Sequence, residues 1–404
     1  MSKGSVYNTV SFLILISFLL GLNPSYFKNT GKWRMLKTNK YCSVVIISYL
    51  FLFAVLVHFA SLEKNPLFDG QLYSFNTFAK LLIYVVALSG VSAVFIMLAF
   101  SFFYKKHFTN FVNNVAVLDE TLRKLGHTIN HQLDFYFCLI MTISGPFLII
   151  GNISMEVWNM PRENIEPLPD TLLACHMLSF LMVHQGETQF VVANIILQSR
   201  FKVLNKILEK LCEKRLRSNS EKNFVVAKDT RNLKIDEQIV DFCMRCHDKL
   251  CDMCAVVNKL YGFPIIVGCV IQFNTIVFSF CYCYYNISIR PISTLGWFFW
   301  SLLRVYELAR KAAFAHLNSN EARATLDWVI KLIIRSDSTL EEKLQIFALQ
   351  LTHRAPSFTA LGFFTIDGSF VFTVIFFVNC QILKICFSSW EPPQHTSQLF
   401  TNFK

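Results

Sequence analysis

The sequence predicts an all-α membrane protein with seven transmembrane helices, a cytosolic N-terminus, an extracellular C-terminus and helical extensions in the cytosol. Three observations predict this fold: long apolar blocks recur along the chain, Lys and Arg gather in alternate gaps between them, and the polar segments keep a helical spacing of apolar residues. Of the 404 residues, 53% are hydrophobic and only 16% are charged, whereas soluble domains carry about 25% charged residues. The composition therefore excludes an ordinary soluble multidomain protein.

Seven apolar blocks are the candidate spans. A helix needs about 20 mostly apolar residues to cross the hydrocarbon core, and its backbone must be hydrogen-bonded internally in lipid. The first, second, third and fifth blocks contain no Asp, Glu, Lys or Arg, the fourth contains only Glu187, and the seventh contains Asp367 and Lys384. The sixth is short and runs into Arg304. The blocks are residues 41–62, 81–104, 135–154, 171–197, 263–285, 289–303 and 358–387.

An eighth apolar block, residues 10–22, is too short to span. A cleaved signal peptide is one interpretation, because Lys3 and small residues flank the block. Cleavage would place the following basic segment outside the cell, whereas Lys and Arg are usually enriched on the cytosolic side of a membrane. An interfacial or re-entrant helix agrees better with the sequence.

The distribution of basic residues predicts the orientation. With the N-terminus in the cytosol, 31 of the 38 Lys and Arg residues fall in cytosolic segments and four fall outside. The two N-x-S/T sequons, at Asn152 and Asn286, both fall at outer ends of spans, and we expect glycosylation at Asn286 in particular.

The polar segments after spans four and six keep helical periodicity, and Ser338 with Glu341 forms a capping-box pattern. Spans four to seven are therefore expected to extend below the membrane as helices. The predicted organisation is a cytosolic N-terminal segment (1–40), spans one to four (41–198), a cytosolic helical loop (199–262), spans five and six (263–305), a second cytosolic helical loop (306–357), span seven (358–387) and an extracellular tail (388–404).

Several motifs in register resemble the insect gustatory receptor family. Residues 245–262, RCHDKLCDMCAVVNKLYG, resemble the helix that enters span five of that family. Arg200-Phe-Lys-Val-Leu-Asn is similar to its segment after span four, and Gly21-Leu-Asn-Pro to its N-terminal motif. Gly362-Phe-Phe-Thr-Ile-Asp resembles the entry to span seven. The resemblance covers nearly the whole chain in order and topology.

The resemblance implies a ligand-gated cation channel that assembles as a homo- or hetero-tetramer with other receptor subunits. Span seven would line the central pore, with Gln381, Lys384, Ile385 and Ser388 on one helical face. The family's span-seven motif, Thr-Tyr followed by five apolar residues and Gln-Phe, is not kept at residues 380–388. A Lys384 side chain in the pore would oppose cation conduction unless it turns away from the axis.

The resemblance also implies a small-molecule tastant that enters a pocket from outside, between the outer halves of spans two to six. Candidate pocket residues are His176, Tyr282, Thr294 and Trp297, although such residues also serve as interfacial anchors. Asp367 is expected either at the inner pore mouth or as an acid stabilised by a helix dipole.

Glu187, beside His184 and Gln185, is expected to hydrogen-bond a neighbouring helix or to act in gating. Four nearby cysteines, Cys243, Cys246, Cys251 and Cys254, would spread over about 16 Å of one helix, so no metal site is predicted.

Other function classes find less support. No phosphate-binding glycine loop, HExxH or GxSxG sequence is present, so neither enzyme activity nor a cofactor is predicted. The net charge of +11 does not indicate a nucleic-acid partner, because the basic residues lie between apolar blocks. A G-protein-coupled receptor would need an outside N-terminus, and a secondary transporter would usually show internal repeats. An insect odorant-receptor-like subunit shares the predicted topology. The expected location is the plasma membrane of sensory neurons.

Overall fold

Long helices follow the predicted apolar blocks and continue past them into the polar segments. The computed structural model describes residues 5–23, 25–30, 33–37, 44, 46–48, 50–51, 53–54, 77–159, 170–221, 229–286, 291–336 and 338–388. The main helices are α5 (Thr77–Lys124), α6 (His131–Asn159), α7 (Asp170–Glu221), α8 (Asp229–Asn286), α9 (Pro291–Ile333), α10 (Ser338–His353) and α11 (Gly368–Ser388). Predicted spans two to six lie within α5 to α9, and most of the first lies outside the described residues.

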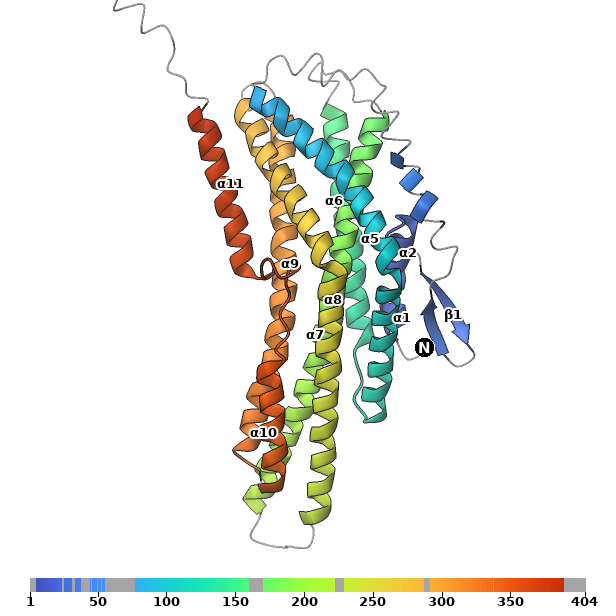
Figure 1. Ribbon diagram of the computed structural model, residues 1–404, viewed down its shortest axis with the longest axis vertical. Helices are drawn as coiled ribbons and strands as arrows, with labels where there is room; N and C mark the ends of the chain where they lie inside the picture. The colour runs from blue at the N-terminus through green and yellow to red at the C-terminus, as the bar shows by residue number, and fades with distance from the viewer. Residues whose placement is uncertain are drawn as a thin grey trace, which may run out of the picture.

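The helices run lengthwise in one elongated bundle (Figure 1). Helices α7, α8 and α9 pack on one another and form its centre, while α10 packs on α8 and α9 at one end, here called the α10 end. Each of the three central helices continues from its apolar part towards the α10 end as one uninterrupted helix. This continuity agrees with the predicted helical extensions, and α10 begins at the predicted Ser338.

The short N-terminal block packs inside the bundle. Helices α1 (Val6–Thr9) and α2 (Ser11–Leu19) contact α6, and Val10 between them and Leu13 of α2 are buried in the core. The chain then turns at Gly21, whose φ of 70° suits glycine. An antiparallel hairpin follows, with β1 (Tyr26–Thr30) paired to β2 (Trp33–Lys37). This hairpin departs from the predicted all-α fold.

Exposed apolar side chains follow one face of α6. They recur at helical three- and four-residue spacing, as expected for a helix that faces lipid. Two described stretches, Ser89–Lys124 and Lys234–Tyr284, are long and apolar enough to cross a bilayer. The exposed α6 residues on this face are Tyr136, Ile140, Ile143, Phe147 and Ile150.

The seventh helix begins at Gly368, not at residue 358 as the apolar pattern predicted. The preceding segment folds into a loop in which Thr359 and Thr365 form an isolated β-bridge. Two consecutive residues, Leu361 and Gly362, have positive φ angles of 52° and 81°, which a helix cannot accommodate. Phe358 and Ile366 are buried in this loop. The burial of these two side chains explains part of the apolar composition of the segment, whereas Leu361 and Phe363 are exposed.

Candidate functional site

A buried network of charged side chains joins α7, α8 and α9. Glu187 of α7 accepts a hydrogen bond of 2.5 Å from Lys311 of α9, and both side chains are at most 1% exposed. Gln272 of α8 lies between them: it donates to Glu187 over 2.8 Å and accepts from Lys311 over 2.9 Å. The hydrogen bond predicted for Glu187 to a neighbouring helix is confirmed, and its partners are Lys311 and Gln272.

A second carboxylate extends the network along α9. Glu307 accepts hydrogen bonds from Arg304 over 2.6 Å and from Gln272 over 3.1 Å, and its Oε1 lies 2.7 Å from Nδ1 of His184. A carboxylate only accepts, so His184 Nδ1 donates. The other ring nitrogen lies 3.2 Å from the hydroxyl of Thr188 and is free to accept from it. Neutral His184 satisfies both contacts.

Two glycines make room for this network. A Cβ atom at Gly268 of α8 would overlap the carboxylate of Glu187, and one at Gly145 of α6 would overlap the imidazole of His184. The close approach of side chain to backbone therefore requires glycine at both positions. The glycine positions let two polar side chains of α7 lie within the packed helices.

The basic members of the network change one part of the sequence interpretation. Arg304, Arg310 and Lys311 are among the basic residues predicted to be cytosolic, but each is at most 4% exposed, inside the bundle. They therefore give no information on orientation. A signal was present: Arg304, Glu307 and Lys311 follow a three- and four-residue spacing that places them on one helical face. Burial of charge is costly unless it is paired, which accounts for the dense hydrogen bonding.

The predicted pocket residues that the structure describes lie together at the end opposite to α10. The rings of Tyr282 and Trp297 have centroids 5.5 Å apart, and Phe278 lies 5.0 Å from Trp297. Thr294 is 6% exposed, and its carbonyl accepts from Cys283 over 3.4 Å. We call Phe278, Tyr282 and Trp297 the outer aromatic cluster. The side chain of His176 lies outside the described residues.

Asp367 caps the first turn of α11. Its carboxylate accepts hydrogen bonds from the backbone N–H of Ser369 over 3.0 Å and of Phe370 over 3.2 Å. It also accepts from the hydroxyls of Ser369 and Thr365 over 2.5 Å and 2.9 Å. These bonds lower the pKa of Asp367. The interpretation as an acid at a helix terminus is what the contacts support, and a place at the pore mouth stays a prediction.

The remaining predicted sites stay untested. Gln381, Lys384, Ile385 and Ser388 lie in the last two turns of α11, where the side chains fall outside the described residues. The same holds for the side chains of the sequon residues Asn152 and Asn286, although both belong to helices. The four cysteines at residues 243–254 of α8 are buried, and in the part of the chain that the structure describes no group of three or more His, Cys, Asp or Glu is placed to hold a metal.

Comparison with known proteins decides the family. The family model for the 7tm chemosensory receptors matches residues 10–383. The chain belongs to this family. The receptor is 22% identical over 436 aligned positions to gustatory receptor 28a of Drosophila melanogaster, with 97% of this chain and 93% of that protein covered. Family membership confirms that the receptor is a membrane chemoreceptor and not an enzyme.

Two solved structures share the fold. The insect olfactory receptor OR5 from Machilis hrabei superposes with a TM-score of 0.64 at 12% identity, covering 93% of this receptor and 97% of OR5. The structure of OR5 in complex with eugenol gives the same TM-score at 13% identity and the same coverage. At this identity the likeness shows the shared fold alone.

Proposed function

We propose that the receptor is a gustatory, ligand-gated cation channel subunit for taste or contact chemosensation. It acts in the plasma membrane of sensory neurons as a homo- or hetero-tetramer with other receptor subunits, and a small-molecule tastant opens it. The family and the gustatory relative, which aligns over nearly the whole chain, support this proposal.

The observation that carries the proposal is the position of α11. This helix lies at one side of the bundle, where it contacts α8 and α9 and buries Val378 (Figure 1). Its side chains Phe372, Phe376 and Phe377 are 76%, 64% and 55% exposed. A large exposed apolar surface usually marks contact with lipid or another protein. Because one side of α11 packs on the bundle and another side is exposed, the exposed side is available to line a pore at the centre of an assembly.

The connection between α10 and α11 would carry movement of α8 to the pore helix. Asn258 of α8 donates to the carbonyl of Ser357 over 2.7 Å and accepts from the N–H of Thr359 over 3.2 Å. Arg354 is ion-paired with Asp248 and Asp252 of α8. Movement of α8 would therefore displace the loop that connects α10 to α11.

Whole-cell recording from the receptor expressed alone, with a broad tastant panel, tests the proposal. We expect a ligand-evoked cation current and a shift of its reversal potential in Lys384→Ala, with Lys384→Arg as the charge-retaining control. An external C-terminal tag verifies surface expression and orientation. A tag that is detected only after permeabilisation would contradict the orientation and with it the channel. Silence at the surface, both alone and with co-expressed gustatory subunits, would contradict a channel role.

A second candidate function is that of an odorant-receptor-like channel subunit, which the fold shared with OR5 favours. Expression in olfactory neurons and currents evoked by volatile compounds, in place of contact stimuli, would support this alternative.

A further inference from the structure

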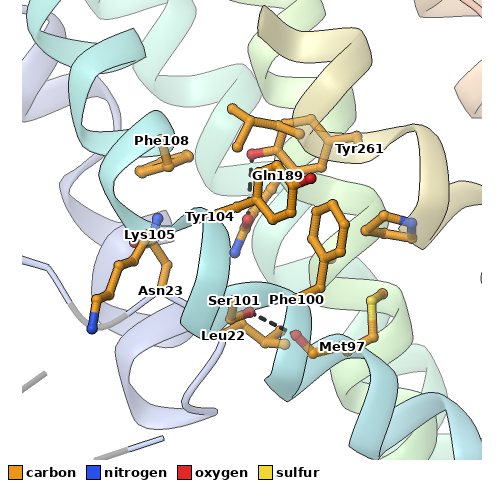
Figure 2. Close-up of a pocket in the computed structure, with 13 residues that line it drawn as sticks. Leu22, Asn23, Met97, Phe100, Ser101, Tyr104, Lys105, Phe108, Gln189 and Tyr261 are labelled. Carbon is orange, nitrogen blue, oxygen red and sulfur yellow. Dashed lines mark hydrogen bonds between the residues drawn. The ribbon is translucent and has the colours of Figure 1, made fainter. Parts of the chain in front are cut away.

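A cleft of about 450 Å³, its open mouth included, lies between the N-terminal turn and helices α5, α7 and α8 (Figure 2). Leu22 and Asn23 line one side, and Gly186 and Gln189 of α7 line another. The cleft is distinct from the outer aromatic cluster, because its lining residue Pro264 and Tyr282 are separated by about 27 Å of α8 at 1.5 Å per residue.

Aromatic side chains form much of the wall. Phe100 and Tyr104 stack with centroids 4.1 Å apart and planes 12° apart, and Phe263 stacks with Phe100 at 6.0 Å, so these rings form a rigid apolar wall. Lys105 also lines the cleft, but its side chain runs away from it in Figure 2, and its ammonium lies 4.7 Å from the Phe102 ring. Its charge therefore does not face the cleft. This lining suits a neutral, flat molecule.

One buried hydrogen-bond donor in the lining is unused. Asn23 is 3% exposed, and its Oδ1 accepts from the hydroxyl of Ser25 over 2.8 Å. Its Nδ2 is buried and has no hydrogen-bond partner among the described residues. A buried donor without a partner costs roughly 1–3 kcal/mol. An acceptor atom on a ligand would satisfy it.

Three other polar side chains of the lining already have partners. Tyr261 donates to Oε1 of Gln189 over 3.3 Å, and Nε2 of Gln189 donates to Ser17 over 2.9 Å. Ser101 donates to the carbonyl of Met97 over 2.8 Å, a bond that Figure 2 shows. Asn23, as a buried lining residue with an unused donor, is therefore the group that we expect to orient a ligand in the cleft.

Met97 gives the cleft an adaptable wall. A Cβ atom at Gly186 would lie 2.5 Å from the terminal methyl of Met97, so the absence of a side chain at Gly186 makes room for Met97. Methionine is flexible and adapts to ligands of irregular shape. A rearrangement of Met97 would enlarge the cleft next to Gly186 of α7. Gly186 directly precedes Glu187 in the sequence.

We propose that this cleft is a second ligand site of the receptor, for a neutral aromatic molecule that carries a hydrogen-bond acceptor. The ring lies against Phe100 and Tyr104, and the acceptor receives a hydrogen bond from Nδ2 of Asn23. Because the cleft joins the N-terminal turn to α5, α7 and α8, a bound ligand stabilises one arrangement of these segments.

Photolabelling with benzophenone tests the site, because this probe is neutral, aromatic, carries a carbonyl acceptor and reacts with nearby C–H bonds on irradiation. The purified full chain in lipid nanodiscs is irradiated, and adducts are located by peptide mass spectrometry. We expect saturable adducts in the segments around Met97 and Pro264. Ser101→Phe, which fills the cleft, should abolish them, and Asn23→Leu should raise the half-saturating concentration about five- to thirtyfold.

Trp297→Leu, in the outer aromatic cluster, should leave these adducts unchanged. Thermal unfolding of each variant verifies that the fold is intact, and loss of adducts counts only in a variant that unfolds at the wild-type temperature. Adducts that survive both Ser101→Phe and Asn23→Leu would overturn the proposal. So would adducts confined to the peptide of Trp297 or to the lipid-facing Phe147. The readout needs no current, so it is independent of the channel proposal.

Discussion

Lys311 of α9 and Glu187 of α7 form a 2.5 Å ion pair in the interior of the receptor, where neither side chain is more than 1% exposed. The pair joins two helices, and its two residues are 124 positions apart in the sequence. Because Gln272 contacts both partners, the pair also fixes α8 in place. Removing one partner of such a pair leaves an uncompensated buried charge.

Lys311→Met should therefore destabilise the receptor by about 3–5 kcal/mol. The measurement is the thermal unfolding temperature in detergent, followed by fluorescence-detected size exclusion. The double variant Glu187→Gln with Lys311→Met removes both charges and should recover a large part of the loss. Arg323→Met changes an exposed cation of the same helix and should have little effect. Equal losses in the single and double variants would contradict the pairing.

Gly145→Ala should destabilise the receptor because the new methyl group overlaps His184. Gly151 lies in the same helix, and no atom lies within 4 Å of the position that a Cβ would take there, which makes Gly151→Ala the matched control. Replacing an exposed glycine within a helix by alanine stabilises the protein by about 0.5–1 kcal/mol. Opposite shifts of the unfolding temperature are expected for the two variants. A rise in both would mean that His184 is free to move away.

Asp367 allows its capping role to be separated from a role in conduction. Asp367→Ala removes the cap and should cost about 0.5–2 kcal/mol of stability. Asp367→Asn keeps a good cap and removes only the charge. If the carboxylate also attracts cations at the pore mouth, single-channel conductance falls in Asp367→Asn while the unfolding temperature is kept. Unchanged conductance in Asp367→Asn would restrict Asp367 to the cap.

The free energy of unfolding of the receptor should decrease in mild acid because of His247, which lies in the part of α8 near the α10 end. Burial lowers the pKa of His247 from 6.5 to about 4. Between these two pKa values the unfolded chain binds a proton to His247 more readily than the folded chain does. The free energy of unfolding is therefore unaffected by this histidine above pH 6.5, and it decreases as the pH falls towards 4. The expected loss is about 2 kcal/mol between pH 8 and pH 5.

Urea unfolding of the receptor at the two pH values measures this loss. His247→Gln should flatten the dependence, because glutamine does not titrate. Neighbouring Asp248 and Arg354 also act on the His247 pKa, in opposite directions. An undiminished dependence in His247→Gln would assign it to other groups.

The helices could be predicted from the sequence, because apolar blocks and helical spacing are local properties. The start of the seventh helix could not be predicted from hydropathy, because Phe358 and Ile366 are apolar for a different reason, burial in a loop. Gly362 and Asp367 were the available signals for that boundary.

The partners of Glu187 were not predictable from the sequence, since Gln272 and Lys311 reach it from distant parts of the chain. Asn23 has no local pattern that indicates a binding site. The cleft exists only because the N-terminal turn packs against helices that are remote in sequence.

Helix α8 is 58 residues long, which corresponds to about 87 Å. Pro264, which lacks the amide needed for a regular helical hydrogen bond, divides it into unequal arms of about 53 Å towards Asp229 and about 33 Å towards Asn286. If α8 tilts as one rigid body about the cleft, its end at Asp229 moves farther than its end at Asn286. A turn of about 5° at Pro264 displaces the short arm's tip by about 3 Å and the long arm's tip by about 5 Å. A small adjustment near the outer aromatic cluster would reach the α10 end amplified.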